Sequence, residues 1–253
     1  TNNLYESGVD YTAASTGVIT WLHAAGCPAN TTIVEGETYY VTYTYTPTDE
    51  QYKPKLFTDG DAIIDQYGPE NATTGILSIA GRLALENGAP AVMLVQAASN
   101  TFNAANYQTA LDKLKNKDNI GYVLAVYPSG GITQTQIDAF SNSIMTHVNY
   151  MSQDSIRRER GAMVGDASSE FATAGGVDNI GDSDTSGTMV YNALKYNDED
   201  IVYVAPDKFT RIDADGNTMN LDANFAACAV AGKVTGQQTV VTPITGMTLT
   251  GIS

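Results

Sequence analysis

Short apolar runs that alternate with helical patterns are the feature that most limits how this chain can fold. Residues 91–96 (AVMLVQ), 121–128 (GYVLAVYP) and 161–166 (GAMVGD) have the length and composition of buried strands. A segment with apolar residues at helical spacing separates each run from the next. Strands separated by such helices form right-handed βαβ units whose sheet is covered on both faces. The sequence therefore predicts an α/β core over residues 48–253.

Capping residues indicate where several of these helices begin and end. Thr73 and Thr74 are placed to cap a helix ahead of the first strand, and Gly88 is placed to stop it. Thr133 and Gln136 have the spacing of a capping box, which predicts that the helix between the second and third strands begins there. A helix is thus expected before each of these strands.

The C-terminal part predicts a strand, a hairpin and a helix in succession. Residues 201–206 (IVYVAP) form a β-branched run that a proline ends, which predicts another buried strand. Asp215 and Gly216 lie between two extended arms and give the strongest short-range signal for a hairpin turn. An Ala-rich helix is expected over residues 223–236.

The first 47 residues have a different pattern, which predicts a mainly β-stranded N-terminal domain or insertion. Residues 17–22 and 37–47 resemble strands, and the second run alternates Tyr and Val with mostly hydroxylated residues. The predicted organisation is therefore a β-rich, Tyr-rich domain over residues 1–47 and an α/β core over residues 48–253.

Charge excludes two classes of partner. The chain has 13 basic and 28 acidic residues and a net charge of −15. Such a field repels nucleic acid and anionic membranes, so neither is expected as a partner. The run Arg157-Arg158-Glu159-Arg160 is interpreted as the end of a helix rather than a phosphate site. Cys27 and Cys228 are far apart in the sequence, which favours two buried thiols over a disulfide.

The loops after the predicted strands are where an α/β protein usually binds a ligand. They contain Ser129, Asp166 and Ser168 but no phosphate-binding lysine and no nucleotide-binding or nucleophile motif. The two histidines are His23, in the β-rich part, and His147, inside a predicted helix. A hydrolase using these serines, Asp166 and His147 remains an alternative, but we predict no catalytic residue and no cofactor.

No metal site is predicted either. Asp213, Asp215 and Gly216 look like the start of a calcium loop, but Asn224 stands where the bidentate glutamate belongs. The acidic loop over residues 175–184 is rich in glycine and would form a poor rigid cage.

Several short motifs recur in one order along the chain. They are Lys55–Phe57, Tyr67-Gly68, Asn87-Gly88-Ala89, residues 204–206, residues 226–236 and Gly251-Ile252. In this order the chain resembles the tail sheath proteins of contractile phage tails and related injection machines. The resemblance covers most of residues 52–253. It implies a fragment that lacks the family's terminal arms and C-terminal domain.

The resemblance implies a structural subunit, not an enzyme. Its partners would be other sheath subunits in helical or stacked rings, the tail tube protein and the baseplate. It would be found in the virion tail, and in the host cytoplasm during assembly. Contraction of the sheath would drive the tube through a target envelope, whereas this fragment alone is expected to be monomeric. A surface adhesin or carbohydrate-binding module is a further alternative, because exposed aromatic residues such as Trp21 suit sugar faces.

Overall fold

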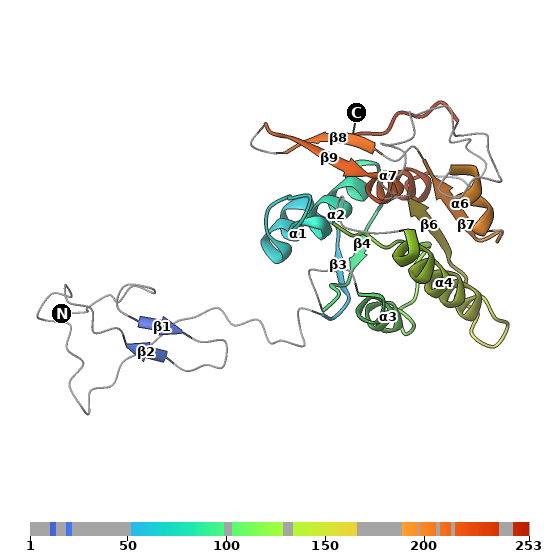
Figure 1. Cartoon of the computed structure of the whole chain (residues 1–253), viewed down its shortest axis with the longest axis horizontal. Coiled ribbons are helices and arrows are strands. Elements are labelled where there is room, and N and C mark those ends of the chain that lie inside the picture. The colour runs from blue at the N-terminus through green and yellow to red at the C-terminus, as the bar shows by residue number, and fades with distance from the viewer. Residues whose placement is uncertain are drawn as a thin grey trace, which may run out of the picture. The chain divides into compact units, whose positions relative to one another are not determined.

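The computed structural model divides the chain into two compact units, Thr1–Tyr45 and Thr46–Ser253 (Figure 1). The structure describes residues 11–13, 19–21, 52–98, 103–128, 134–165, 189–196, 198–205, 208–213, 216–237 and 245–252. In the first unit, strands β1 (Tyr11–Ala13) and β2 (Ile19–Trp21) pair antiparallel. Strand β2 lies inside the run predicted at residues 17–22, whereas the Tyr-rich run at residues 37–47 lies outside the described residues.

The second unit contains helices on both sides of short strands. Its helices are α1 Gly60–Tyr67, α2 Ile76–Glu86, α3 Ala104–Lys113, α4 Gln134–Met151, α6 Met189–Lys195 and α7 Ala223–Thr235. Its strands are β3 Lys55–Phe57, β4 Val92–Leu94, β5 Tyr122–Val123, β6 Gly161–Gly165, β7 Ile201–Val204, β8 Lys208–Ile212 and β9 Thr218–Asp222.

Strands β5, β6 and β7 form a parallel sheet in that order, and β6 lies between α4 and α7 (Figure 1). The parallel pairing predicted for the runs at residues 121–128, 161–166 and 201–206 is confirmed. The prediction that β7 is buried is only partly right. Val204 is buried, but Val202 is 41% exposed because β7 is the edge strand of this sheet.

The run at residues 91–96 differs more from expectation. Only Val92–Leu94 forms a strand, and its partner is β3, antiparallel, rather than β5. The residues of β4 are half-buried rather than buried. The described strands therefore form separate small sheets.

Two helices cover opposite faces of the parallel sheet. Phe140 and Ile144 of α4 pack with Ala162 and Val164 of β6 in one cluster of buried side chains. Met163 lies between them in the strand and packs with Ala226 of α7 in another cluster. Successive residues of a strand point to opposite faces, which explains this division.

The C-terminal elements form as the sequence predicts. Strands β8 and β9 pair antiparallel around a turn in which Gly216 has a φ of 85°. Helix α7 follows immediately, and Gly236 is its C-terminal cap. Its small residues permit close approach to α2, because a Cβ added at Gly232 would lie 2.2 Å from the carbonyl oxygen of Ala84.

The start of α2 corrects one prediction. Thr73 and Thr74 do not cap the helix, because Gly75 is its N-cap and makes no side-chain bond. The Asn71 side chain instead accepts hydrogen bonds from the amides of Thr73, at 2.9 Å, and Thr74, at 3.2 Å. The turn ahead of the helix is thus organised by an asparagine. Gly88, with a φ of 104°, follows its C-terminal cap as predicted. Thr133 lies outside the described residues.

Candidate functional site

The residues considered for catalysis are only partly described. Ser129, Asp166, Ser168 and His23 lie outside the described residues. His147 is described and is 2% exposed on α4.

The surroundings of His147 are those of a neutral, buried ring. Its Nε2 atom lies 3.2 Å from Nη1 of Arg160. Burial, followed by the charge of Arg160, lowers the pKa of His147 to about 4. Near neutral pH the ring is therefore uncharged and can accept a hydrogen bond from the guanidinium. This contact holds Arg160 and brings no nucleophile to the ring.

The residues considered for a calcium loop have other roles. Asp213 accepts a hydrogen bond from the amide of Asn217 at 2.8 Å, within the hairpin turn. Asn224 is buried on α7 and donates to the carbonyl of Tyr127 at 3.0 Å. Asp215 and the loop at residues 175–184 lie outside the described residues. Across the described ranges, no group of three or more His, Cys, Asp or Glu residues could hold a metal ion.

The prediction that Arg157-Arg158-Glu159-Arg160 forms the end of a helix is wrong. Helix α4 ends at Met151, and the run lies in the following loop. Arg160 donates instead to the carbonyls of Leu114, at 3.2 Å, and Lys117, at 3.0 Å. These carbonyls lie at the C-terminal end of α3, where a cation is favourable. A basic residue of the run therefore does bind at a helix C-terminus, but the helix is α3 rather than α4.

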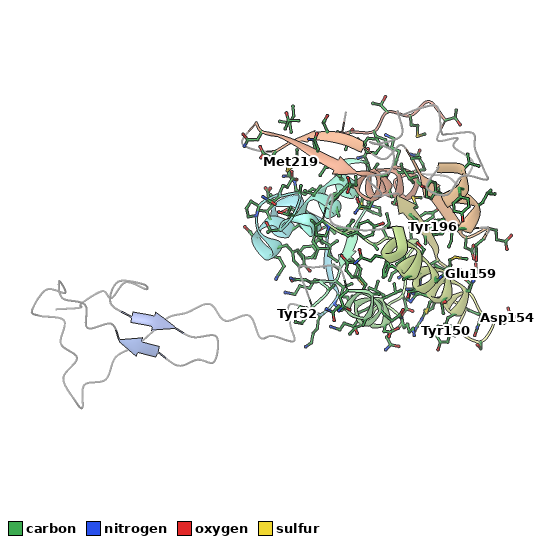
Figure 2. All side chains as sticks on the ribbon, viewed as in Figure 1. Tyr52, Tyr150, Asp154, Glu159, Tyr196 and Met219 are labelled. Carbon is green, nitrogen blue, oxygen red and sulfur yellow. The ribbon has the colours of Figure 1, made fainter. Side chains whose placement is uncertain are left out.

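Acidic residues also lie around the basic run. Arg158 donates to the carbonyl of Lys115 at 2.8 Å and pairs with Asp118 at 2.6 Å. Asp154 and Glu159 lie near the same end of α4 (Figure 2). The local mixture of signs gives no basic patch for a phosphate.

A buried cluster of charges is the most strongly organised group of polar side chains in the described residues. Arg211 of β8 is 4% exposed and binds two carboxylates. Its Nε and Nη2 atoms donate to Glu70 at 2.9 and 2.7 Å, and Nη1 and Nη2 donate to Glu86 at 2.9 Å each. Arg82 also pairs with Glu70, at 2.9 Å. Two guanidinium groups and two carboxylates thus balance their charges, with the side chains of Arg211 and Glu70 buried and those of Arg82 and Glu86 partly exposed.

Burial alone would lower the pKa of Arg211. Hydrogen bonds that Arg211 donates to Glu86 and Glu70, and the negative charges of these two residues, outweigh burial and raise that pKa above its usual value. Arg211 is therefore permanently charged. It joins strand β8 to the last turn of α2, where Glu86 lies, and to the α1–α2 connection, where Glu70 lies.

The same corner fastens the segment that contains Gly251. Arg211 Nη1 donates to the carbonyl of Gly251 at 3.1 Å. Gly251 has a φ of 80°, and a Cβ there would lie 2.4 Å from both Arg211 and Glu86. The Asn87 side chain donates to the carbonyl of Thr250 at 2.9 Å and accepts from its amide at 2.8 Å. One asparagine therefore pairs with a backbone unit as a neighbouring strand would.

Sequence reasoning missed the members of this cluster: Glu70, Arg82, Glu86 and Arg211. One signal was present for Arg211. It lies two residues after Phe209 in a strand, so it shares a face with an apolar residue and points inward. The partners carry no comparable signal, because they are distant in sequence.

The structure also brings together three of the motifs on which the resemblance depends. Asn87 contacts Thr250, next to Gly251. A Cβ at Gly236 would lie 2.4 Å from the carbonyl oxygen of Gly88, so the two motifs touch through their glycines. Segments separated by more than a hundred residues thus meet at one corner, which we call the Arg211 corner.

Comparison with known proteins gives one informative result. No family model matches the chain. It is 28% identical, over 209 residues, to a protein named "Tail sheath protein" from Mycobacterium phage Bxz1. The match covers 78% of this chain and 32% of the relative, so the chain spans about a third of that protein. This similarity supports the resemblance to tail sheath proteins. Within the described residues, no helix has the length and apolar character needed to cross a membrane.

Proposed function

We propose that this chain is part of a structural subunit of a contractile phage tail sheath. The observation that carries the proposal is the similarity to the tail sheath protein of Mycobacterium phage Bxz1, at 28% identity over 78% of this chain. In this role the subunit surrounds a tail tube and contracts to drive it through the target cell envelope. The chain has no catalytic task.

The Arg211 corner supports this proposal physically. The motifs shared with sheath proteins are low in information when read singly, but three of them are in contact here. These contacts join α2, α7 and the Gly251 segment. They give a structural explanation for why the motifs occur together in one chain. The charge cluster then acts as a rigid joint in a subunit that transmits force.

The same proposal assigns partners and location. The partners are other sheath subunits in helical or stacked rings, the tail tube protein and the baseplate. The protein is found in the virion tail, and in the host cytoplasm while tails assemble. The net charge of −15 makes association dependent on salt, because like charges repel less strongly when screened.

We also propose the fold class and its division. An α/β core over residues 48–253 carries the sheath-like motifs, and a mainly β-stranded, Tyr-rich part over residues 1–47 is peripheral. The paired strands β1 and β2 and the parallel sheet β5-β6-β7 support this arrangement.

Expression of the whole gene product, followed by negative-stain electron microscopy, tests the proposal. We expect rings or tubes with a regular axial repeat, more abundant at moderate salt than at low salt. A particle that stays monomeric across salt concentrations, with or without tail tube protein, would contradict it.

A further inference from the structure

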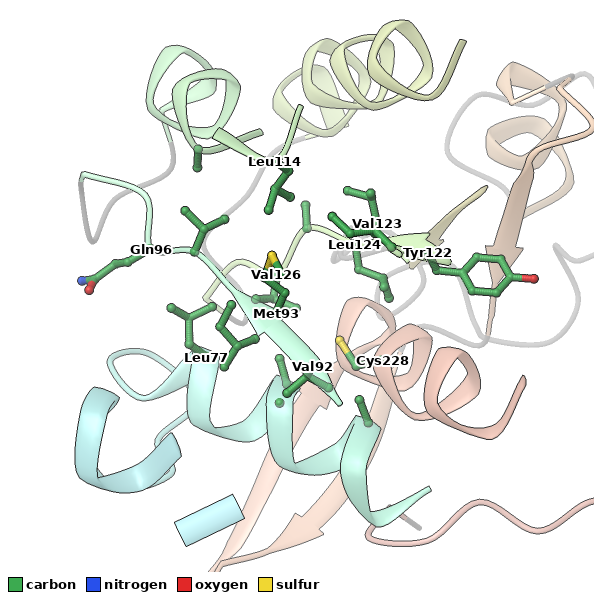
Figure 3. A pocket seen from close by; sticks show the side chains of 18 of the residues that line it. Leu77, Val92, Met93, Gln96, Leu114, Tyr122, Val123, Leu124, Val126 and Cys228 are labelled. Atoms are coloured by element: carbon green, nitrogen blue, oxygen red, sulfur yellow. The ribbon is translucent and has the colours of Figure 1, made fainter. Parts of the chain in front are cut away.

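A large, mainly apolar cavity that is partly open to solvent separates two of the small sheets. Its volume is about 780 Å³, and it lies between β4 and β5, with α3 on one side and α2 and α7 on the other (Figure 3). Its lining includes Leu77, Met93, Leu114, Leu124, Val126 and Cys228. Side chains that face each other in a protein interior are normally packed as densely as organic crystals, and those on the two sides of this opening are not. Its apolar walls would gain dispersion contacts if they met.

Among the described strands, β4 and β5 have only one neighbour each. Strand β4 pairs with β3, and β5 pairs with β6, and no other described strand lies beside either of them. A strand edge carries backbone N–H and C=O groups that need partners when they are buried. These two edges face the same cavity, so each is the available partner of the other.

The two strands also agree in the way their side chains alternate. Met93 and Val95 pack against the cluster that contains Val123 and residues of α3. On the other face, Leu124 packs against the cluster of α2 and α7. Leu94 also faces α2, since a Cβ at Gly81 would lie 3.0 Å from its Cδ1. Residues on one face of β4 therefore share a layer with residues on the same face of β5, as in one sheet.

The connection between the strands suits a parallel pair. Helix α3 lies between β4 and β5 in sequence, which makes the segment a βαβ unit. In Figure 3 the run from Val92 to Gln96 and the run from Tyr122 to Val126 proceed in the same direction across the cavity.

We propose that β4 can pair with β5 as a parallel neighbour, and that the cavity is the open state of this junction. We call the junction between β4 and β5 the seam. Closure gives one sheet of order β3-β4-β5-β6-β7 and removes the cavity. The alternation of side chains puts Met93 and Val123 on one face, and in the closed sheet we place these two residues side by side. The β3–β4 ribbon thereby becomes a movable flap on a fixed parallel sheet. This proposal does not depend on the proposed function.

Nuclear magnetic resonance of the full chain tests this directly. We expect nuclear Overhauser effects between backbone protons of residues 92–94 and 122–124, and slow amide exchange along both strands. Absence of these effects, with xenon bound in the cavity, would overturn the proposal.

Cross-linking gives a second readout that does not require spectral assignment. In a background without Cys27 and Cys228, the pair Met93→Cys and Val123→Cys lies on one face and should oxidise to a disulfide almost completely. The matched pair Met93→Cys and Leu124→Cys lies on opposite faces and should stay reduced. Equal oxidation of the two pairs, or of neither, would contradict the closed seam.

Discussion

Replacing Arg211 with methionine tests the role assigned to the charge cluster. Methionine keeps much of the length and apolar character of the side chain but removes the charge. Glu70, which is 4% exposed, then keeps Arg82 as a partner, but the cluster is left with one excess negative charge. Removing one partner of a buried ion pair costs about 3–5 kcal/mol when the other charge is left uncompensated. Arg82 remains beside both carboxylates, so we expect the lower end of that range, about 3 kcal/mol. Since whole domains are stable by only about 5–15 kcal/mol, Arg211→Met should be severely destabilising.

Urea unfolding followed by far-ultraviolet circular dichroism is the appropriate assay. The chain has one tryptophan, Trp21, which belongs to the other unit, so its fluorescence would not report on the core. The matched control is Arg157→Met, because Arg157 is exposed and should change stability by less than about 0.5 kcal/mol. If Arg211→Met were as mild as this control, the cluster would not hold the corner together.

A double-mutant cycle separates charge balance from packing. Glu70→Gln in the Arg211→Met background leaves Arg82 and Glu86 as a balanced pair. The double variant should therefore be more stable than the sum of the single changes predicts, by about 1–3 kcal/mol. Simple additivity would mean that the residues act independently, and the cluster argument would fail.

Three further changes probe other parts of the core. His147 has a pKa of about 4 in the fold, against 6.5 ordinarily, so its contribution to the free energy of unfolding is complete above pH about 6.5 and is lost as pH falls toward 4. His147→Gln should therefore remove up to about 3 kcal/mol of the pH dependence of stability, measured by urea unfolding from pH 7 to 4. An unchanged pH profile would refute this prediction. Gly232→Ala should destabilise by about 1–3 kcal/mol through overpacking against α2, whereas Gly121→Ala, whose Cβ would meet Thr235 at an ordinary 3.6 Å, should not; similar melting temperatures for the two would contradict this. Asn87→Ala should speed hydrogen exchange at residues 249–252, since both hydrogen bonds between the Asn87 side chain and Thr250 are lost. Unchanged protection there would show that these two bonds do not hold the segment.

Local patterns predicted much of the fold because each depends on neighbouring residues. Gly88 and Gly216 end a helix and turn a hairpin through positive φ angles, which glycine adopts without strain. The strand at residues 161–166 was identifiable from its continuous apolar run. Thr73 and Thr74 were wrongly predicted to cap α2. The N-cap is Gly75, and the amides of both threonines are bonded to Asn71 in the turn before the helix.

The polar organisation could not be predicted in the same way. Arg211 meets Glu70 and Glu86 across 141 and 125 residues of sequence, and no local pattern encodes such pairing. Arg160 shows the same limit, since the helix end it binds belongs to α3 rather than to α4. The short motifs that led to the sheath resemblance were readable, but the contact between Asn87 and Thr250 that explains them required the fold.

The most direct test of the sheath assignment is to label tails with an antibody raised against residues 46–253. Particles whose genome encodes this chain would be imaged by electron microscopy, before and after contraction is triggered. If the chain is part of the sheath, label should lie at regular intervals along the tail, and the labelled length should shorten on contraction. Label confined to the baseplate, the fibres or the head, or absent from particles altogether, would contradict it.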